Sequence, residues 1–314
     1  MTEQTKPQVL EYECEVLTPM FLAGADGMTP ELRPSSIKSA IRFWWRAFNF
    51  YPSYEKMLEK ETSLFGGIRG EENKGLKSPF QIKVIPGKIK YGNKEDYSRP
   101  LSKRFKTKLQ PMQAINFLAF GIRMGDKQIE RDYISAGSTF RIEIKFRANT
   151  SEGAFKEIKQ AVQRWLFIGN LGSKARNGYG ALHCRNMENA ESLFTGSKYA
   201  NSKNPPYSVI SKFSSLHKTV KTYSSPLEAQ SEVAKLYAGA RQSTESKESQ
   251  EKNSRPTKCM FISVNKENAQ YRGWYLYMPF EYPKGVSAKS YHEIHEKIIS
   301  SAKGNGTNLL EPVI

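Results

Sequence analysis

The sequence has little cysteine and no long apolar run. Its three cysteines, Cys14, Cys184 and Cys259, lie far apart in 314 residues, so their spacing fits neither a disulfide framework nor a zinc knuckle. Arg42 and Arg46 interrupt the most aromatic stretch, and no apolar segment approaches the length of a membrane-spanning helix. The polar residues 1–7 also lack the apolar centre of a signal peptide. We therefore expect a cytoplasmic protein in a reducing compartment, with no membrane contact.

Acidic residues are scarce relative to basic ones. The chain has 48 lysines and arginines against 31 acids, a net charge of +17. Part of the excess lies in residues 87–111, where eight basic residues and two acids give a net charge of +6 in a stretch without clear periodicity. This balance favours nucleic acid or another anionic partner, although it does not identify a fold.

Hydrophobic periodicity predicts the element order of the first half. Thr139–Arg147 alternates strictly between apolar and polar residues, which is typical of a half-buried strand. The other elements that we expect are strands at Val9–Leu17, Phe80–Pro86 and Ala181–Arg185, and helices at about 34–50, Tyr54–Leu64 and Glu152–Phe167. The main elements follow the ferredoxin-like (RRM-like) order, in which an antiparallel sheet carries two helices on one face.

The second half repeats this order only in part. We expect strands at Tyr207–Phe213, Cys259–Val264 and Trp274–Phe280, and helices at Pro226–Arg241 and Tyr291–Ala302. The sequence thus predicts an α+β protein with two domains. Residues 1–189 form a ferredoxin-like domain with a basic insertion and a Gly-rich loop. Residues 190–314 form a second, degenerate one with a flexible loop near 242–256.

The first long helix has two different faces. Ile37, Ile41, Trp44 and Phe48 share one face, which we expect to be buried against the sheet. A line of cations with no intervening acid occupies another face, which favours a polyanion because a solvated helix face usually mixes signs. A plain solvated face remains the alternative. The residues predicted to contact RNA here are Arg33, Lys38, Arg42 and Arg46, with Trp45 as a stacking partner for a base.

The second candidate is the Gly-rich loop, residues 169–180. It is not a Walker A loop, because no Gly-Lys-Ser/Thr closes it, and it enters a strand where a dinucleotide fingerprint would enter a helix. Glycines allow the backbone to approach a phosphate closely. An ordinary helix-to-strand connection is the alternative. The predicted phosphate cradle is Gly169, Gly172, Gly178 and Gly180, with charge from Lys174 and Arg176 and stacking by Tyr179.

These motifs resemble the RAMP superfamily of CRISPR-associated proteins. Besides the Gly-rich loop, the resemblance rests on Leu17–Phe21 with Gly24-Ala25-Asp26, on Glu31–Pro34 leading to Arg42-Phe43-Trp44-Trp45-Arg46, and on Glu61 with Leu64-Phe65-Gly66. More narrowly, the chain is similar to the first RAMP subunit of the Cmr (type III-B) RNA-targeting complex. Ser36 and Ser39 depart from the expected Pro and Gly, and Ala175 and Asn177 replace basic residues usual in the Gly-rich loop.

The resemblance implies a non-catalytic RNA-binding subunit of a ribonucleoprotein that acts in antiviral defence. Such a subunit holds guide CRISPR RNA and/or target RNA near the 3′ end of the guide and contacts other Cmr subunits. No cofactor and no metal are implied, and cleavage belongs to other subunits.

The alternative function is catalysis. Some RAMP proteins are metal-independent endoribonucleases that use a histidine as general acid or base. The candidates are His183, His217, His292 and His295, and a structural role is favoured for His183 because Leu182 and Cys184 place it in a sheet. His292 and His295 are one residue short of the zinc-protease spacing and have no evident third ligand.

Overall fold

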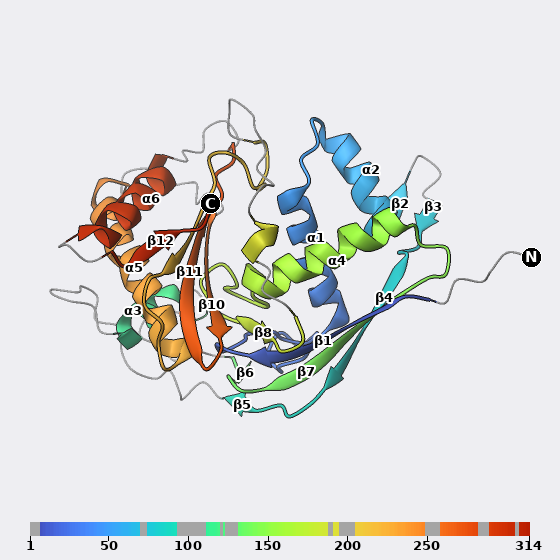
Figure 1. The fold of residues 1–314 in the computed structure, drawn as a ribbon, viewed down its shortest axis with the longest axis horizontal. Coiled ribbons are helices and arrows are strands. Elements are labelled where there is room, and N and C mark those ends of the chain that lie inside the picture. Colours follow the sequence, from blue (N-terminus) through green and yellow to red (C-terminus); the bar gives the residue numbers. More distant parts are fainter. Residues whose placement is uncertain are drawn as a thin grey trace, which may run out of the picture.

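The computed structural model describes residues 7–69, 74–92, 111–119, 122, 131–187, 191–194, 205–248, 258–281, 289–304 and 308–314. Within these residues, two four-stranded sheets form the framework of the protein (Figure 1). None of the described helices is long and apolar enough to cross a membrane.

The first sheet has the predicted ferredoxin-like topology. Its strand order is β4-β7-β1-β8, and every neighbouring pair is antiparallel. Helices α1 and α4 lie on the same side of this sheet (Figure 1). The elements are β1 (Val9–Val16), α1 (Pro34–Phe48), α2 (Tyr54–Phe65), β4 (Phe80–Pro86), β7 (Thr139–Phe146), α4 (Glu152–Arg164) and β8 (Leu182–Cys184). A small hairpin, β2 (Gly67–Arg69) with β3 (Lys74–Leu76), follows α2.

The second sheet repeats the topology, which confirms the prediction of two ferredoxin-like units. Its order is β10-β11-β9-β12, again with antiparallel neighbours. The elements are β9 (Ser215–Thr219), α5 (Pro226–Glu248), β10 (Met260–Glu267), β11 (Gln270–Tyr277), α6 (Lys289–Ala302) and β12 (Leu310–Pro312). All strands of the first sheet precede residue 189, but the exact domain boundary stays a prediction.

Three details differ from the sequence-based expectations. The strand expected at Tyr207–Phe213 lies instead at Ser215–Thr219, and β12 was not expected. The predicted flexible loop is helical at its start, because α5 continues to Glu248. Thr244 explains the extension: its buried hydroxyl donates to Ala240 O at 3.0 Å and accepts from Lys297 Nζ of α6 at 2.9 Å. Residues 249–256 lie outside the described residues.

The end of α4 also differs. The helix changes to a π-helical turn at Trp165–Gly169, called η2 here, before it enters the Gly-rich loop. Every residue of this turn is buried. Such turns often occur at functional sites.

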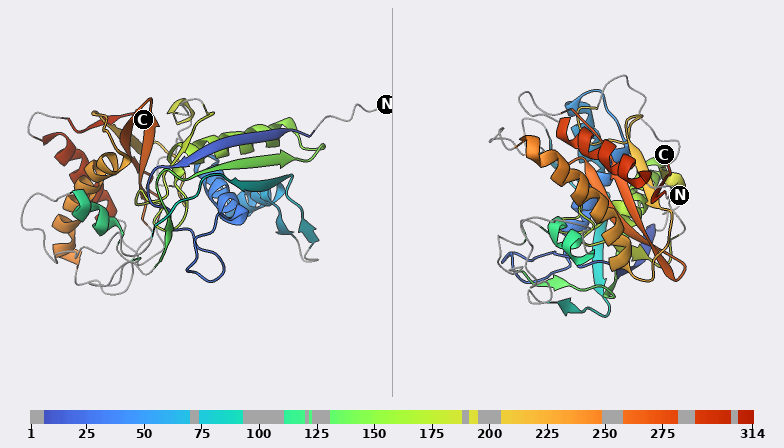
Figure 2. Two further views of the ribbon diagram at one scale, coloured as in Figure 1. Left: turned by 90° about the horizontal axis from the view of Figure 1, so that it is seen from below. Right: turned by 90° about the vertical axis from the view of Figure 1, so that its left-hand side faces the viewer.

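The insertion between β4 and β7 contributes structure to the second unit. Most of its basic segment lies outside the described residues. The described parts are β5 (Tyr91–Gly92), β6 (Tyr133–Ile134) and α3 (Pro111–Leu118). Helix α3 packs beside α5, as both Figure 1 and Figure 2 show. Ile115 and Leu118 share an apolar cluster with Val233 and Tyr237 of α5.

One apolar core joins the two units. The predicted inner face of α1 is confirmed, since Ile37, Ile41 and Trp44 are buried. Trp44 contacts Phe261 of β10 at a ring-centroid distance of 5.8 Å. Phe167 of η2 contacts Trp274 of β11 at 4.9 Å. One face of the second sheet therefore covers the end of the first core.

The other face of the second sheet holds two histidines, of which His217 of β9 is half-buried and His295 of α6 is buried. His295 of α6 stacks on Tyr277 with ring centroids 4.0 Å apart, and its Nδ1 is 3.0 Å from the Tyr275 hydroxyl. Burial lowers the pKa of His217 and of His295 to about 4, and repulsion between the two rings adds to the effect on His295.

We predict that the free energy of unfolding decreases as the pH falls from about 6.5 to about 4. Both histidines titrate near 6.5 in the unfolded chain and near 4 in the folded one, so the unfolded chain takes up protons first. Above pH 6.5 this contribution is constant. Urea unfolding at pH 7.5, 6 and 5 measures it. His217→Gln with His295→Gln should reduce the pH dependence, and an unchanged dependence in that double variant contradicts the assignment.

Candidate nucleic-acid interface

Asn170 fixes the Gly-rich loop on the second sheet. This residue is 3% exposed and has a left-handed backbone, with φ of 48°. Its side-chain amide donates to Ile262 O at 2.7 Å and to Ala175 O at 2.5 Å, and its Oδ1 accepts from Ser263 Oγ at 2.6 Å. One buried side chain thus sets the loop's shape and its attachment to β10.

Further hydrogen bonds attach the loop to two other segments. Tyr179 donates its hydroxyl to Ile115 O at 2.9 Å, and Asn177 Nδ2 donates to Leu118 O at 2.7 Å, so the loop also holds α3. Lys258 Nζ donates to Asn177 Oδ1 at 2.6 Å. The loop is therefore a junction between both units and the insertion.

The glycines of this loop mostly serve packing. A Cβ on Gly180 would lie 1.9 Å from Leu171 O, and one on Gly169 would lie 2.3 Å from Trp44 Nε1. Gly178 and Gly180 are buried and do not line the cavity described below, so the structure brings only part of the predicted cradle to it. Gly169 and Gly172 do line that cavity.

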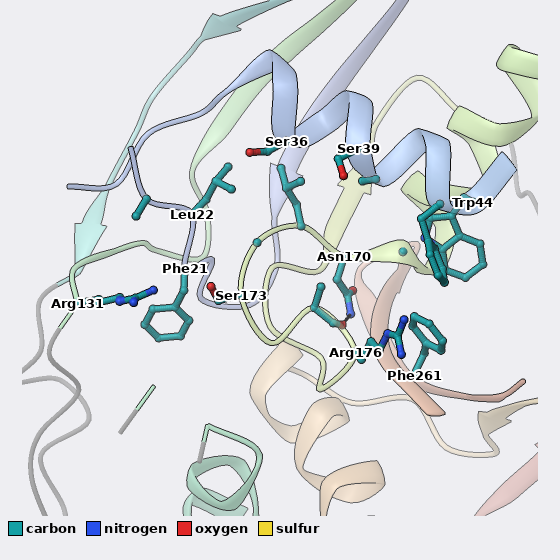
Figure 3. A pocket seen from close by; sticks show the side chains of 17 residues that line it. Phe21, Leu22, Ser36, Ser39, Trp44, Arg131, Asn170, Ser173, Arg176 and Phe261 are labelled. Atoms are coloured by element: carbon teal, nitrogen blue, oxygen red, sulfur yellow. Dashed lines mark hydrogen bonds between the residues drawn. The ribbon is translucent and has the colours of Figure 1, made fainter. Parts of the chain in front are cut away.

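A cavity of about 530 Å³ lies between the Gly-rich loop and α1; we call it the loop cavity. Figure 3 shows Ser36 and Ser39 of α1 along one side, with Arg131 and Arg176 on either side of the loop. Among the described residues, no acid lines it. The lining residues that the argument uses are Ser36, Ser39, Phe43, Arg131, Gly172 and Arg176.

Arg176 is held in place at the cavity. Its guanidinium carbon lies 4.9 Å from the centre of the Phe261 ring and 5.5 Å from that of Phe43, and Nη1 donates to Lys258 O. Cation–π contacts of this kind keep a guanidinium charged and oriented.

Backbone amides add donors to the loop side of the cavity. In the part of the chain that the structure describes, the amides of Gly172, Lys174 and Ala175 donate to no protein acceptor. Gly172 and Ala175 line the cavity, and Lys174 adopts a left-handed φ of 61° between them. Burial lowers the pKa of Lys174. Successive free amides beside cations form an anion-binding concavity.

The cation stripe of α1 lies outside this cavity and is partly neutralised. Arg42 Nε is 3.1 Å from Glu61 Oε1, and Arg46 Nη1 is 3.1 Å from Glu61 Oε2. The Glu61 side chain, from α2, is only 6% exposed. The two arginines are therefore structural partners of one buried carboxylate, an acid that the helix sequence alone did not show.

Lys38 and Arg33 complete the stripe. The Lys38 ammonium lies 5.3 Å from the centre of the Phe80 ring, and burial, followed by repulsion from Arg42, lowers the pKa of Lys38. Arg33 is the residue before α1 and is half-buried. RNA contact by these four cations stays a prediction.

The structure contradicts the prediction that Trp45 and Tyr179 stack on a base. Trp45 and Tyr179 are both 0% exposed. The Trp45 indole donates to Glu157 Oε2 at 2.9 Å, and the Tyr179 hydroxyl is bonded to α3. Neither ring presents a face to a base. Phe43, which is half-buried and lines the cavity, is the aromatic that sequence reasoning missed.

The candidate histidines lie elsewhere. His183 is half-buried in β8, and burial, then Lys266 and Arg185, lower its pKa against the opposing effect of Glu15. His217 and His295 are in the second sheet and α6. Among the described residues that line the loop cavity there is none of these three histidines, nor His292 of α6.

Comparisons with known proteins agree with this architecture. Residues 13–183, more than half of the chain, match the model of the RAMP superfamily. The chain is 27% identical over 185 residues to the CRISPR system Cmr subunit Cmr1-2 of Pyrococcus furiosus, covering 54% of this chain and 92% of that protein. It is also 27% identical over 179 residues to Cmr1-1 of the same organism, covering 55% of this chain and 46% of that one.

Solved structures extend the likeness of fold to nearly the whole chain. The crystal structure of apo Cmr1 from Pyrococcus furiosus matches with a TM-score of 0.63 at 18% identity, covering 98% of both chains. A chain in a cryo-EM structure of the type III-B Cmr-beta complex bound to cognate target RNA matches with a TM-score of 0.54 at 12% identity, covering 94% of this chain and 100% of that one.

We predict that Arg42→Ala with Arg46→Ala lowers the free energy of unfolding by about 3 kcal/mol, because the buried Glu61 carboxylate loses its counter-charges. Adding Glu61→Leu to the double variant should recover much of the loss, since an apolar side chain needs no partner there. Chemical denaturation of the wild type and both variants measures the differences. A double variant as stable as the wild type would show that the pairs contribute nothing.

Proposed function

The chain belongs to the RAMP superfamily, and on that basis we propose that it is a non-catalytic RNA-binding subunit of a type III-B (Cmr) ribonucleoprotein. In this proposal it holds guide and/or target RNA near the 3′ end of the guide, in the cytoplasm, as part of antiviral defence. The observation that carries the proposal is the loop cavity, which combines two arginines, free amides and aromatic rings, and whose described lining includes no acid.

The chemistry of the loop cavity suits a nucleotide of single-stranded RNA. Arg131 and Arg176 supply charge for phosphates, and the amides of Gly172 and Ala175 supply short-range donors. Ser36 and Ser39 offer hydroxyls to a ribose, and Phe43 offers an apolar surface to a base. Phosphate and sugar contacts dominate this set, so we expect little sequence preference.

The likeness to Cmr subunits supports the choice of complex. The named relatives are subunits of CRISPR Cmr systems, and one structural match is a chain of a complex bound to cognate target RNA. By analogy, other Cmr subunits are the proposed protein partners. The excess of basic residues over the whole chain, +17, suits a polyanionic ligand.

We predict that Arg131→Ala weakens RNA binding about tenfold, because a charge-assisted phosphate contact is lost. Ser39→Glu, which places a negative charge on the exposed edge of α1 inside the cavity, should weaken it further. Each lost phosphate contact should reduce the log–log salt slope by about 0.7. Fluorescence anisotropy with a labelled single-stranded RNA at several salt concentrations measures both quantities.

Arg147→Ala is the matched control. Arg147 is exposed just after β7 and does not line the loop cavity. Its replacement by alanine removes the same unit of net charge from the protein as Arg131→Ala does. Equal weakening by Arg131→Ala and Arg147→Ala would indicate diffuse attraction without a site at the cavity.

We assign the chain no catalytic step, and we predict that it leaves RNA intact. The alternative is the histidine-dependent endoribonuclease. Incubation of purified protein with end-labelled single-stranded RNA, with and without a chelator, followed by denaturing electrophoresis, separates the two. Site-specific cleavage that persists with chelator and disappears in His183→Ala would establish the ribonuclease.

A further inference from the structure

We propose that a second cavity, between β8 and the β10–β11 hairpin, binds one unstacked RNA base. We call it the edge groove; it has a volume of about 450 Å³. The inference rests on the proposed RNA-binding function and adds a site to it. The lining residues that carry the argument are Phe167, Leu182, His183, Met187, Asn265 and Lys266.

The edge of β8 presents unpaired backbone groups to this groove. Strand β8 is the outer strand of its sheet and pairs only with β1. Arg185 N donates to Glu13 O, and Leu17 N donates to Ala181 O, so the alternating pattern turns the peptide groups of Leu182 and Cys184 away from β1. In the described part of the chain these groups have no backbone partner. Such a strand edge can pair with the donors and acceptors of a ligand.

Two side chains that line the groove add further hydrogen-bonding groups to it. Asn265 of β10 is 8% exposed, and its Nδ2 has no hydrogen-bond acceptor among the described residues. His183 is half-buried, and its lowered pKa keeps the imidazole neutral at pH 7, so the ring offers one donor and one acceptor. A carboxamide, a neutral imidazole and a strand edge are groups that can read the hydrogen-bonding edge of a base.

The remaining walls suit a flat ring. Phe167 of η2 is held against Trp274, with ring centroids 4.9 Å apart, and Leu182 and Met187 complete an apolar surface. A nucleobase has apolar faces and a polar rim, which matches a groove with one apolar surface and one row of donors and acceptors.

The charged groups at the groove are paired. Its described lining carries one cation, Lys266, and one carboxylate, Glu267. Glu15 is shared by Lys266, at 3.4 Å, and Arg185, at 3.3 Å. Glu267 is bonded to Arg272 at 2.6 Å, and Arg272 also lies 4.0 Å from Glu311. Because each of these carboxylates has a cationic partner, their repulsion of a phosphate is reduced.

One strand connects the edge groove to the loop cavity. Phe261 lines the loop cavity, Ser263 bonds to Asn170, and Asn265 lines the edge groove. These three alternate residues share a face of β10. Phe261 and Asn265 are four positions apart along the strand, a distance of roughly 13 Å. The two cavities therefore flank the Asn170 anchor, close enough for two nucleotides of one bound strand.

The test compares two RNAs of equal length, one with uracil bases and one with abasic riboses, by fluorescence anisotropy at a fixed salt concentration. The wild type should prefer the base-containing chain. Asn265→Leu and His183→Leu should each reduce that preference about three- to tenfold, as expected for one lost hydrogen bond, and leave the abasic affinity unchanged. Asn265→Leu removes an unbonded buried donor and keeps the number and branching of the side-chain heavy atoms, so it should fold. Circular dichroism melting checks this.

Gln81→Leu is the matched control, because Gln81 is an exposed amide on β4 that lines neither cavity. An unchanged base preference in both groove variants overturns the edge groove as a base site, and so does a wild type that binds both RNAs equally. If RNA binding survives with its sensitivity to Arg131→Ala, only the edge groove fails. If the wild type binds neither RNA, the proposed function itself fails.

Discussion

The hydrogen bonds of the Asn170 side chain are the constraint on which the arrangement depends. A single carboxamide, buried at the end of the π-helical turn, joins the Gly-rich loop to two successive positions of β10. Because both its donor and its acceptor are used, the loop has one position relative to the second sheet. That position puts Arg176 beside Phe43 and Phe261 and leaves the neighbouring amides unbonded. The proposed binding surface of the loop therefore depends on the role of the loop as a structural junction.

The cations of α1 show that residues in a pattern typical of a polyanion site can instead pair with an acid of the folded protein. Three like charges at helical spacing are typical of a polyanion site, and no acid lies between them. The acid comes from α2, where Glu61 is buried beneath Arg42 and Arg46. Helix spacing could not show this pairing, although Glu61 was already among the residues that resemble the family. The edge of the same helix that faces the loop cavity carries small hydroxyl side chains.

The fold was predictable where local periodicity decides it. Strict alternation located β4 and β7 almost to the residue, and the apolar stripe of α1 identified its buried face. The strand at Ser215–Thr219 was missed because it is short and its alternation is weak. Trp45 and Tyr179 were misassigned because a sequence does not show whether an aromatic side chain is buried with a hydrogen-bond acceptor beside it, here Glu157 and Ile115 O. The cavity residues Arg131 and Phe261 come from distant segments that only tertiary contacts bring together.

The packing of α3 on α5 has a consequence for the order in which the protein is made. Helix α3 lies near residue 115, and the surface that it covers is formed by residues more than 100 positions later. During synthesis from the N-terminus, the first sheet and α1 can assemble while the apolar side of α3 still has no surface to cover. Contacts so distant in sequence are slow to form, because a long loop must close first. The nascent first half therefore has to keep an apolar helix exposed until α5 has left the ribosome.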